Sequence, residues 1–443
     1  MILPSNRLIL FFALIVPPLT ALAAFFPPAF PLAVLCGGGL LLIAIFDAFR
    51  SGTALRGIEV QAPEFSRLHK GRPGTFQLNF ANEGRGRLLF RIGCVVPPEI
   101  ELEEEIRELE IAAGTEKGEC TWACTPTKRG LFRLETVVLE SLSPFGLWLV
   151  RDQRKIEHEL RVYPDLLAER QRVSALFLRR GMTGTHTQRR AGQGREFEKL
   201  RDYVAGDSLG DVHWKASAKR RHLVTRLHQI ERSHEVYVVV DASRLSGREI
   251  PGQPGVSVLE RYVTSALILG AAAERQGDQF GLITFSDRVL TFLRARAGQG
   301  HYDTCRENLY TLQPQAVTPD FNEVFSFIRS RLNKRALVII LTSLDDPFLA
   351  ESFAQAAAVI SRQHLLLVNM LRPDAVRPVF TNADVDTLDD VYRELSGHLR
   401  WEKLRELERI LARRGVRFGL LDPVMVAAEL VRQHSDVRER ELV

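Results

Sequence analysis

Hydrophobic residues at the start of the chain form two long runs without charge. Residues 8–26 and residues 31–46 carry no charged side chain, and only "PPAF" separates them. An α-helix needs about 20 apolar residues to cross the hydrocarbon layer of a bilayer. The pattern therefore predicts two membrane-spanning helices joined by a short turn at Pro27 and Pro28. Pro17 and Pro18 predict a kink in the first helix, which a bilayer tolerates where neighbouring groups satisfy the freed carbonyls.

The flanking charges predict how this hairpin is oriented. Arg7 precedes the first run, Arg50 and Arg56 follow the second, and the turn has no charge. Because positive flanks favour the cytoplasmic side, we expect an inner-membrane protein with both ends of the hairpin, and its soluble part, in the cytoplasm. The hairpin makes the lipid bilayer a predicted binding partner of the protein. Arg7, the apolar run and "ALA" at residues 21–23 are also typical of a cleaved secretory signal, an alternative that the proline pair and the second run disfavour.

Residues 51–165 alternate between apolar and polar positions in short stretches, which predicts a small β-sandwich. The stretch "GTFQLNFANEGRGRLLFRIGCVV" reads as two strands with "NEGRG" as a hairpin turn between them. The stretch "EIELEEEIRELEI" is ambiguous, because its apolar residues fit both a helical and an alternating spacing. Strands are favoured there because the neighbouring segments are β.

From residue 233 onward, continuous apolar strands such as "EVYVVVDAS" and "RALVIILTS" alternate with helical patterns. This order predicts an α/β fold with a doubly wound, mainly parallel sheet. The expected organisation has four parts: a transmembrane hairpin at 1–50, a β-sandwich at 51–165, a basic joining segment at 166–232, and the α/β domain at 233–443.

The composition excludes some classes of protein but does not indicate a function. The chain has 443 residues, 45% of them hydrophobic and 26% charged, so it can bury real cores. A net charge of +5 is weak evidence for nucleic-acid binding. The five cysteines form no regular framework. Cys120 and Cys124 have no second pair or histidine beside them to complete a zinc set.

Candidate chemistry lies after the first α/β strand, where ligands of such sheets bind beyond the carboxyl ends. Asp241 and Ser243 follow that strand, and a carboxylate with hydroxyls suits a hard cation such as magnesium. The alternative is that Asp241 caps a turn or a helix.

The segment 194–231 has three possible roles. Acidic residues are interleaved with its basic ones, which argues against tracking of nucleic-acid phosphates. His213 has no serine or cysteine nucleophile beside it, and no P-loop, GxSxG or HExxH motif is present. We favour a structural joint, in which the aromatic residues pack on the α/β domain while Arg201, Asp207 and Lys215 form partly buried ion pairs.

The same segment resembles the signature of the bacterial family called domain of unknown function 58. The matching positions include Glu196, Phe197, Leu200, Arg201, Tyr203, Gly206, Asp207, Trp214 and Lys215, and "PFGL" at residues 144–147 matches an upstream motif. Gly210 departs from the usual arginine. The resemblance implies a membrane-anchored protein with a von Willebrand factor type A-like domain, linked with MoxR-type AAA+ ATPases and without a settled activity.

The type A resemblance also implies a metal site, which this chain matches only in part. Its pattern is Asp-x-Ser-x-Ser, followed by a threonine and a later aspartate. Asp241 and Ser243 match, and Thr318 is a candidate threonine. Leu245 takes the place of the third ligand and Ser343 that of the aspartate, with Asp345 and Asp346 beyond it. The resemblance therefore implies at most weak magnesium binding and otherwise no cofactor.

The sequence predicts a non-enzymatic interaction protein that does not bind nucleic acid, and the family resemblance implies that it acts with a MoxR-type AAA+ ATPase and an unknown client protein. The alternative is a metal-dependent hydrolase with its site at Asp241. The missing acid at Ser343 counts against it.

Overall fold

The computed structural model describes residues 1–51, 55, 57–84, 87–112, 114, 118–179, 191–192, 196–204, 209–229, 234–374, 376–378, 381 and 387–440. The chain divides into two compact units, Met1–Asp165 and Leu166–Val443. The finer boundaries that the sequence suggests stay predictions.

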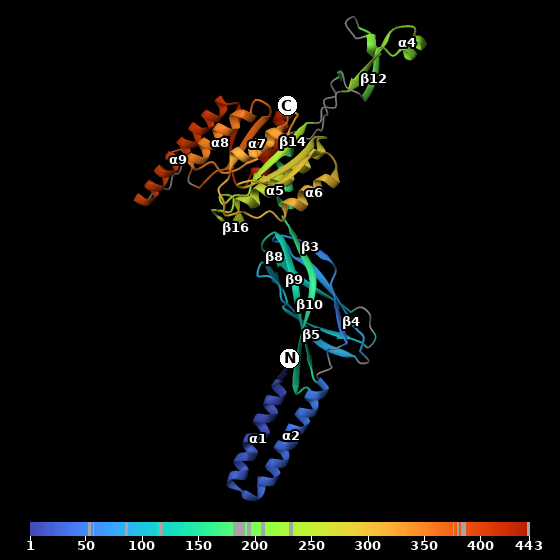
Figure 1. The fold of residues 1–443 in the computed structure, drawn as a ribbon, viewed down its shortest axis with the longest axis vertical. Helices are drawn as coiled ribbons and strands as arrows, with labels where there is room; N and C mark the ends of the chain where they lie inside the picture. Colours follow the sequence, from blue (N-terminus) through green and yellow to red (C-terminus); the bar gives the residue numbers. More distant parts are fainter. Residues whose placement is uncertain are drawn as a thin grey trace. The chain divides into compact units, whose positions relative to one another are not determined.

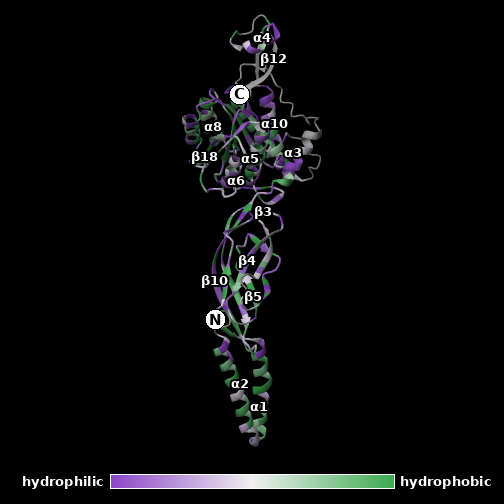
Figure 2. Ribbon diagram, turned by 90° about the vertical axis from the view of Figure 1, so that its right-hand side faces the viewer, coloured by the Kyte–Doolittle hydropathy of each residue, from purple (hydrophilic) through white to green (hydrophobic). Residues whose placement is uncertain are grey.

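Two apolar helices open the first unit, as predicted (Figure 1). Helix α1 spans Asn6–Phe25, the short 3₁₀ helix η1 spans Pro27–Ala29, and α2 spans Phe30–Ser51. Their mean hydropathy of 2.4 and 2.3 and their length suffice for crossing a membrane. Figure 2 shows that hydrophobic residues dominate both. Helix α1 continues through Pro17 and Pro18, and the hydroxyl of Thr20 donates to the Pro17 carbonyl at 2.9 Å.

Two sheets form a sandwich in the rest of this unit. One has the order β1-β10-β9-β5-β7, with β3 also paired to β10, and the other has the order β2-β4-β8-β6. Apolar side chains from both sheets, with Trp122 and Phe76 stacked at 5.6 Å between ring centroids, fill the core. The strands are β1 Ile2–Pro4, β2 Ile58–Gln61, β3 Phe65–His69, β4 Gly74–Asn82, β5 Leu88–Cys94, β6 Ile100–Leu102, β7 Ile106–Ile111, β8 Gly118–Pro126, β9 Gly130–Leu142 and β10 Trp148–Tyr163.

One prediction for this region is confirmed and another is wrong. The ambiguous acidic stretch forms strands, β6 and β7. The predicted hairpin at "NEGRG" does not exist, because β4 pairs with β2 and β8 while β5 pairs with β7 and β9. The connection between β4 and β5 therefore passes from one sheet to the other. Both strands alternate in the way a hairpin would, so the pattern alone could not separate the two connections.

The second unit is built on a mixed six-stranded sheet of order β18-β17-β14-β19-β20-β21, in which only the edge pair β17–β18 is antiparallel. Odd and even residues of β14 face different helices, so both faces of the sheet are covered. The predicted α/β class is confirmed at this level. The elements are β14 Glu235–Asp241, α5 Val258–Arg275, β17 Gln279–Phe285, β18 Val289–Arg296, α6 Gln299–Leu309, α7 Phe321–Arg331, β19 Leu337–Leu341, α8 Pro347–Ile360, β20 Leu365–Leu371, α9 Leu388–Arg413, β21 Val416–Leu421 and α10 Val426–Glu439.

Residues before β14 contribute two further pieces. Helix α3, Leu167–Arg179, was not expected, and it adds Val173 to the apolar cluster under α5 and α10. A separate three-stranded sheet has the order β11-β13-β12, with β11 Ala191–Gly192, β12 Glu196–Asp202, β13 Val224–Gln229 and the short helix α4 Trp214–Arg220. A small hairpin, β15 Glu249–Ile250 with β16 Gln253–Ser257, precedes α5.

Candidate functional site

The candidate site lies at the carboxyl ends of the parallel strands β14 and β19. Asp241 is the last residue of β14 and its side chain is fully buried. Thr342 directly follows β19, which pairs with β14 in parallel. Parallel pairing places both carboxyl ends at one edge of the sheet, where ligands of open α/β sheets bind.

Both oxygens of the Asp241 carboxylate have protein partners. Oδ1 accepts a hydrogen bond from the backbone N–H of Ser243 at 2.8 Å. Oδ2 accepts one from the Thr342 hydroxyl at 2.6 Å. Burial raises the pKa of the Asp241 carboxyl above its ordinary range, while the hydrogen bonds from Thr342 and Ser243 oppose that rise. The carboxylate is therefore held by neutral donors in a buried position.

The loop that follows β14 folds back on itself. Ser243 and Ser246 are both buried, and the Ser246 hydroxyl donates to the Ser243 carbonyl at 2.7 Å. Leu245, at the third position of the predicted ligand pattern, is buried. The Ser246 hydroxyl, which follows Leu245 in sequence, is thus bonded to a backbone carbonyl of the turn and does not replace the missing ligand.

The other predicted ligands, Thr318 and Asp345, are not hydrogen-bonded to Asp241. Thr318 is exposed, although its loop is close by, since the Arg244 N–H donates to the Val317 carbonyl at 3.0 Å. Asp345 forms an ion pair with Arg248 at 2.8 Å. Within the described part of the chain, no group of three or more histidine, cysteine, aspartate or glutamate side chains is arranged to hold a metal ion.

The structure adds a residue that the sequence did not single out. Thr342 occupies the position between β19 and Ser343, and it is the side chain that reaches Asp241. Its backbone carbonyl also accepts a hydrogen bond from the Tyr262 hydroxyl at 2.9 Å. The sequence did contain a signal for Thr342, since a hydroxyl residue directly follows the buried strand that pairs with β14. It was missed because the family pattern places its aspartate one residue later, at Ser343.

The signature segment differs from its predicted role as a buried joint. Trp214 begins α4 with a side chain that is 63% exposed, and Lys215 is exposed as well. The prediction that Trp214 packs in a buried joint is therefore wrong. The reason is that these strands pair among themselves and bury a small core of their own, formed by Val212 and Val224.

The remaining signature residues are placed only in part. Leu200 and Tyr203 are half-buried. Glu196, Phe197 and Arg201 lie along β12, where the structure describes the backbone only, while Gly206 and Asp207 lie outside the described residues. His213 has the structural role expected for it, because its ring Nδ1 accepts a hydrogen bond from the Ala216 N–H at 3.2 Å and caps α4.

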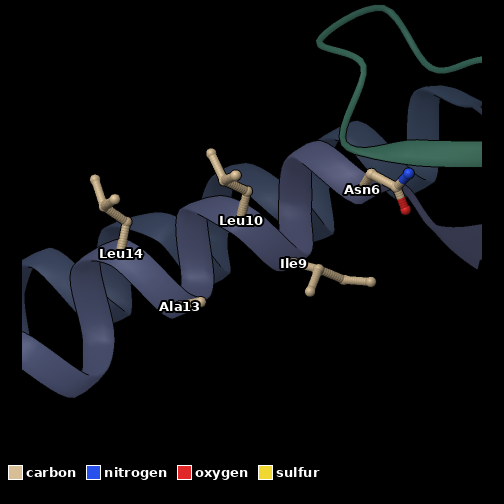
Figure 3. A pocket seen from close by; sticks show the side chains of 5 residues that line it. All are labelled: Asn6, Ile9, Leu10, Ala13 and Leu14. Atoms are coloured by element: carbon tan, nitrogen blue, oxygen red, sulfur yellow. The ribbon is translucent and has the colours of Figure 1, made fainter.

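A hollow on α1 offers no catalytic chemistry. It is lined by Asn6, Ile9, Leu10, Ala13 and Leu14, all from one helix (Figure 3). Leu10 and Leu14 project outward from the helix in this view. A single amide among apolar side chains suits contact with lipid better than binding of a polar substrate.

These features define a class: a mixed α/β sheet with a buried aspartate at its carboxyl edge, in a chain that begins with two helices apolar enough to span a membrane. Residues 199–377 match the model of the family described as "Protein of unknown function DUF58". The match confirms, for this part of the chain, the family resemblance of the signature segment.

Individual relatives and structures resemble this chain more distantly. An uncharacterized protein of Mycobacterium tuberculosis is 22% identical over 192 residues, which are 43% of this chain and 59% of that protein. The crystal structure of the conserved hypothetical protein BatB from Bacteroides thetaiotaomicron covers 47% of this chain and 100% of its own, with 17% identity and a TM-score of 0.32. An aerotolerance-related membrane protein from Bacteroides fragilis covers 46% and 99%, with 19% identity and a TM-score of 0.30.

Proposed function

We propose that this protein is a membrane-anchored, non-catalytic interaction module that acts with a MoxR-type AAA+ ATPase in the assembly or maturation of a client protein. The exposed indole of Trp214 carries this proposal, because it lies within the family-matched segment and is 63% accessible. Exposed tryptophans are uncommon on isolated surfaces and are enriched among the residues that dominate protein–protein binding.

The proposal assigns the α/β unit a von Willebrand type A-like role in protein binding. Parallel strands covered by helices on both faces and the Asp241-x-Ser243 pair at the carboxyl edge support this assignment. The two apolar helices would hold the protein in the inner membrane, and Arg7 and Arg50 at their outer ends favour a cytoplasmic location for both soluble units.

A metal-dependent hydrolase with its site at Asp241 is the alternative, and the donor set supports it less well. Magnesium prefers six oxygen ligands, usually with one or two carboxylates among them. Asp241 supplies one carboxylate whose oxygens already accept hydrogen bonds from Ser243 and Thr342. Asp345, the acid two residues after Ser343, is paired with Arg248. We therefore assign the protein at most a weak magnesium site.

Affinity purification from detergent-solubilised membranes, followed by mass spectrometry, tests the interaction. We expect a MoxR-type AAA+ ATPase to be recovered with the native protein and lost with Trp214→Ala. Phe348→Ala is the matched control, because this side chain is 83% exposed but lies outside the signature segment. Equal recovery of the ATPase with all three proteins would contradict the role of Trp214, and its absence from every sample would contradict the partnership.

A reporter that is active only in the periplasm, fused after Val443, tests the orientation. We expect no activity from this fusion and strong activity from a fusion within the turn at Pro27 and Pro28. The reverse pattern would place the soluble units on the other side of the membrane.

A further inference from the structure

Asp47, near the end of α2, binds a loop of the β-sandwich. Its side chain is fully buried. Its carboxylate accepts hydrogen bonds from the Ser143 hydroxyl at 2.5 Å, the Phe145 N–H at 3.1 Å and the Leu147 N–H at 3.3 Å. The charge is thus satisfied by donors of residues 143–147, the loop between β9 and β10, which matches the "PFGL" motif of the sequence.

The same loop is bound to both apolar helices. Ser5, the cap of α1, donates its N–H to the Leu147 carbonyl at 2.9 Å and its hydroxyl to the Gly146 carbonyl at 2.6 Å. On the other side, the indole N–H of Trp148 donates to the Ala44 carbonyl of α2 at 2.7 Å. The loop therefore has a fixed position beside the ends of the two helices.

The loop leaves none of its described backbone N–H groups unpaired. Besides the two bonds to Asp47, Ser143 N–H donates to Trp148 O at 2.8 Å, Gly146 N–H to Ser143 O at 2.8 Å, and Trp148 N–H to Ser143 Oγ at 2.9 Å. The remaining residue of the loop is a proline, which has no N–H. Non-helical backbone can approach a bilayer core only when its polar groups are satisfied within the protein, and this loop meets that requirement for its donors.

The side chain at the tip of the loop lies level with the last apolar turn of α2. Phe145 is 54% exposed, and its ring centroid is 6.5 Å from that of Phe46, the last residue of the uncharged run. Phe49, one turn further, is 82% exposed. The Arg50 guanidinium lies 6.0 Å from the centre of the Phe46 ring. Phenylalanine side chains beside a basic residue are typical of segments that lie at the membrane–water boundary.

We propose that the loop at residues 143–147 is a third membrane contact of this protein. Asp47 fixes it to α2, and Phe145 enters the boundary between lipid headgroups and acyl chains next to Phe46 and Phe49. The proposed occupant is the bilayer, because the helices that the loop contacts are those expected to cross it. The inference rests on the proposed membrane anchoring and adds that the β-sandwich itself touches the lipid.

Photolabelling of the full-length protein in phosphatidylcholine nanodiscs tests this proposal, with a diazirine placed near the carbonyl end of the acyl chain and adducts mapped by mass spectrometry. We expect adducts on α1, on α2 and at Phe145. Leu131, which is 39% exposed at the other end of β9, is the matched control and should stay unlabelled. Labelled helices with an unlabelled Phe145 would overturn the third contact and leave the anchor intact, whereas unlabelled helices would overturn both.

Two variants separate the lipid contact of Phe145 from the hydrogen bonds by which Asp47 holds the loop. In Phe145→Ser the loop adduct should be lost while labelling of α1 and α2 persists. In Asp47→Ala the N–H groups of Phe145 and Leu147 lose their acceptor, so we expect faster amide hydrogen exchange at both residues and loss of the Phe145 adduct. Asp152→Ala, which removes a half-buried acid of β10 that pairs with Arg154 and not with the loop, should change neither readout. Unchanged exchange and labelling in Asp47→Ala would overturn the proposal that Asp47 fixes the loop to α2.

Discussion

Asp241 ends β14 and Asp278 immediately precedes β17, so the two acids lie at opposite ends of neighbouring parallel strands. Both side chains are buried, with exposures of 0% and 1%. Asp241 accepts hydrogen bonds from an amide and a hydroxyl. Asp278 accepts them from the His234 N–H at 3.0 Å and from the His434 ring at 2.9 Å.

The comparison shows that burial alone does not decide how a carboxyl group behaves. Burial raises the pKa of Asp241, and its neutral donors do not reverse that rise. Burial acts on Asp278 in the same direction, but the contacts with His234 and His434 outweigh it and hold the pKa of this carboxyl well below its ordinary range. The amino end of the sheet therefore holds a stable anion that binds α10 through His434, whereas the donors that bind Asp241 at the carboxyl end, a backbone N–H and a hydroxyl, are both neutral.

Removal of the Asp278 carboxylate should have the largest effect. Asp278→Ala leaves the buried His434 ring without its acceptor, and losing one member of a buried polar pair costs about 3 kcal/mol of unfolding free energy. Urea unfolding of the full-length protein in detergent micelles measures the loss. Asp436→Ala, in the same helix but paired with Arg432 at its partly exposed surface, is the control and should cost much less. Equal losses would show that the His434 contact contributes little.

The pH dependence of two asparagine variants should have opposite signs. A lowered native pKa gives Asp278 a stabilising contribution that is present above about pH 4 and is lost as the pH falls, so the deficit of Asp278→Asn should shrink in acid. A raised native pKa makes ionised Asp241 unfavourable, so Asp241→Asn should gain stability relative to the native protein as the pH rises from about 4 through that raised value. Unfolding curves across this range measure both differences. If the stability differences of both variants changed with pH in the same direction, the contrast drawn between Asp241 and Asp278 would be wrong.

At neutral pH the isosteric change Asp241→Asn should alter stability by only about 1 kcal/mol, because the amide oxygen still accepts one hydrogen bond and the Thr342 hydroxyl can accept from the new NH₂ group. Calorimetric titration with magnesium should give no clear isotherm for either protein. A one-site isotherm with a dissociation constant below about 100 μM, lost in Asp241→Asn, would show that the carboxyl edge is a metal site after all.

The ion pair at the rim of the candidate site should matter least. Arg248 and Asp345 have side chains that are 55% and 28% exposed, and such pairs contribute about 0–1 kcal/mol because water and salt screen them. Arg248→Ala should therefore leave the melting temperature nearly unchanged. If magnesium affinity rises in this variant, Asp345 is a metal ligand that the ion pair with Arg248 normally blocks. The carboxyl end of the sheet would then differ from the amino end by binding a metal ion.

Periodicity in the sequence predicted the α/β unit well, because helix α5 and strands such as β14 and β19 bury long apolar runs that few other arrangements satisfy. It failed at the connection between β4 and β5, since alternation specifies a strand and its inward face but not its neighbour. The sheet order of a sandwich depends on contacts between residues far apart in the chain.

The candidate site could be predicted less completely. Asp241 and Ser243 were found because they directly follow a recognisable strand. Thr342 was not, because its role depends on the pairing of β19 with β14 rather than on any local motif. The burial expected for Trp214 assumed that aromatic residues in a charged segment pack on a larger domain, whereas this segment pairs its strands into a sheet of its own.

Strand β10 gives the first unit a mechanical property. It begins at Trp148, whose indole is bonded to α2, and continues for 16 residues to Tyr163, near the end of the unit, a span of about 50 Å. It is hydrogen-bonded along most of this length to the antiparallel strand β9, with one irregularity between Lys155 and His158. Tension along the strand loads these bonds in shear, many at once, rather than one after another. A pull applied beyond Tyr163 would thus reach the apolar helices without first unzipping the sandwich.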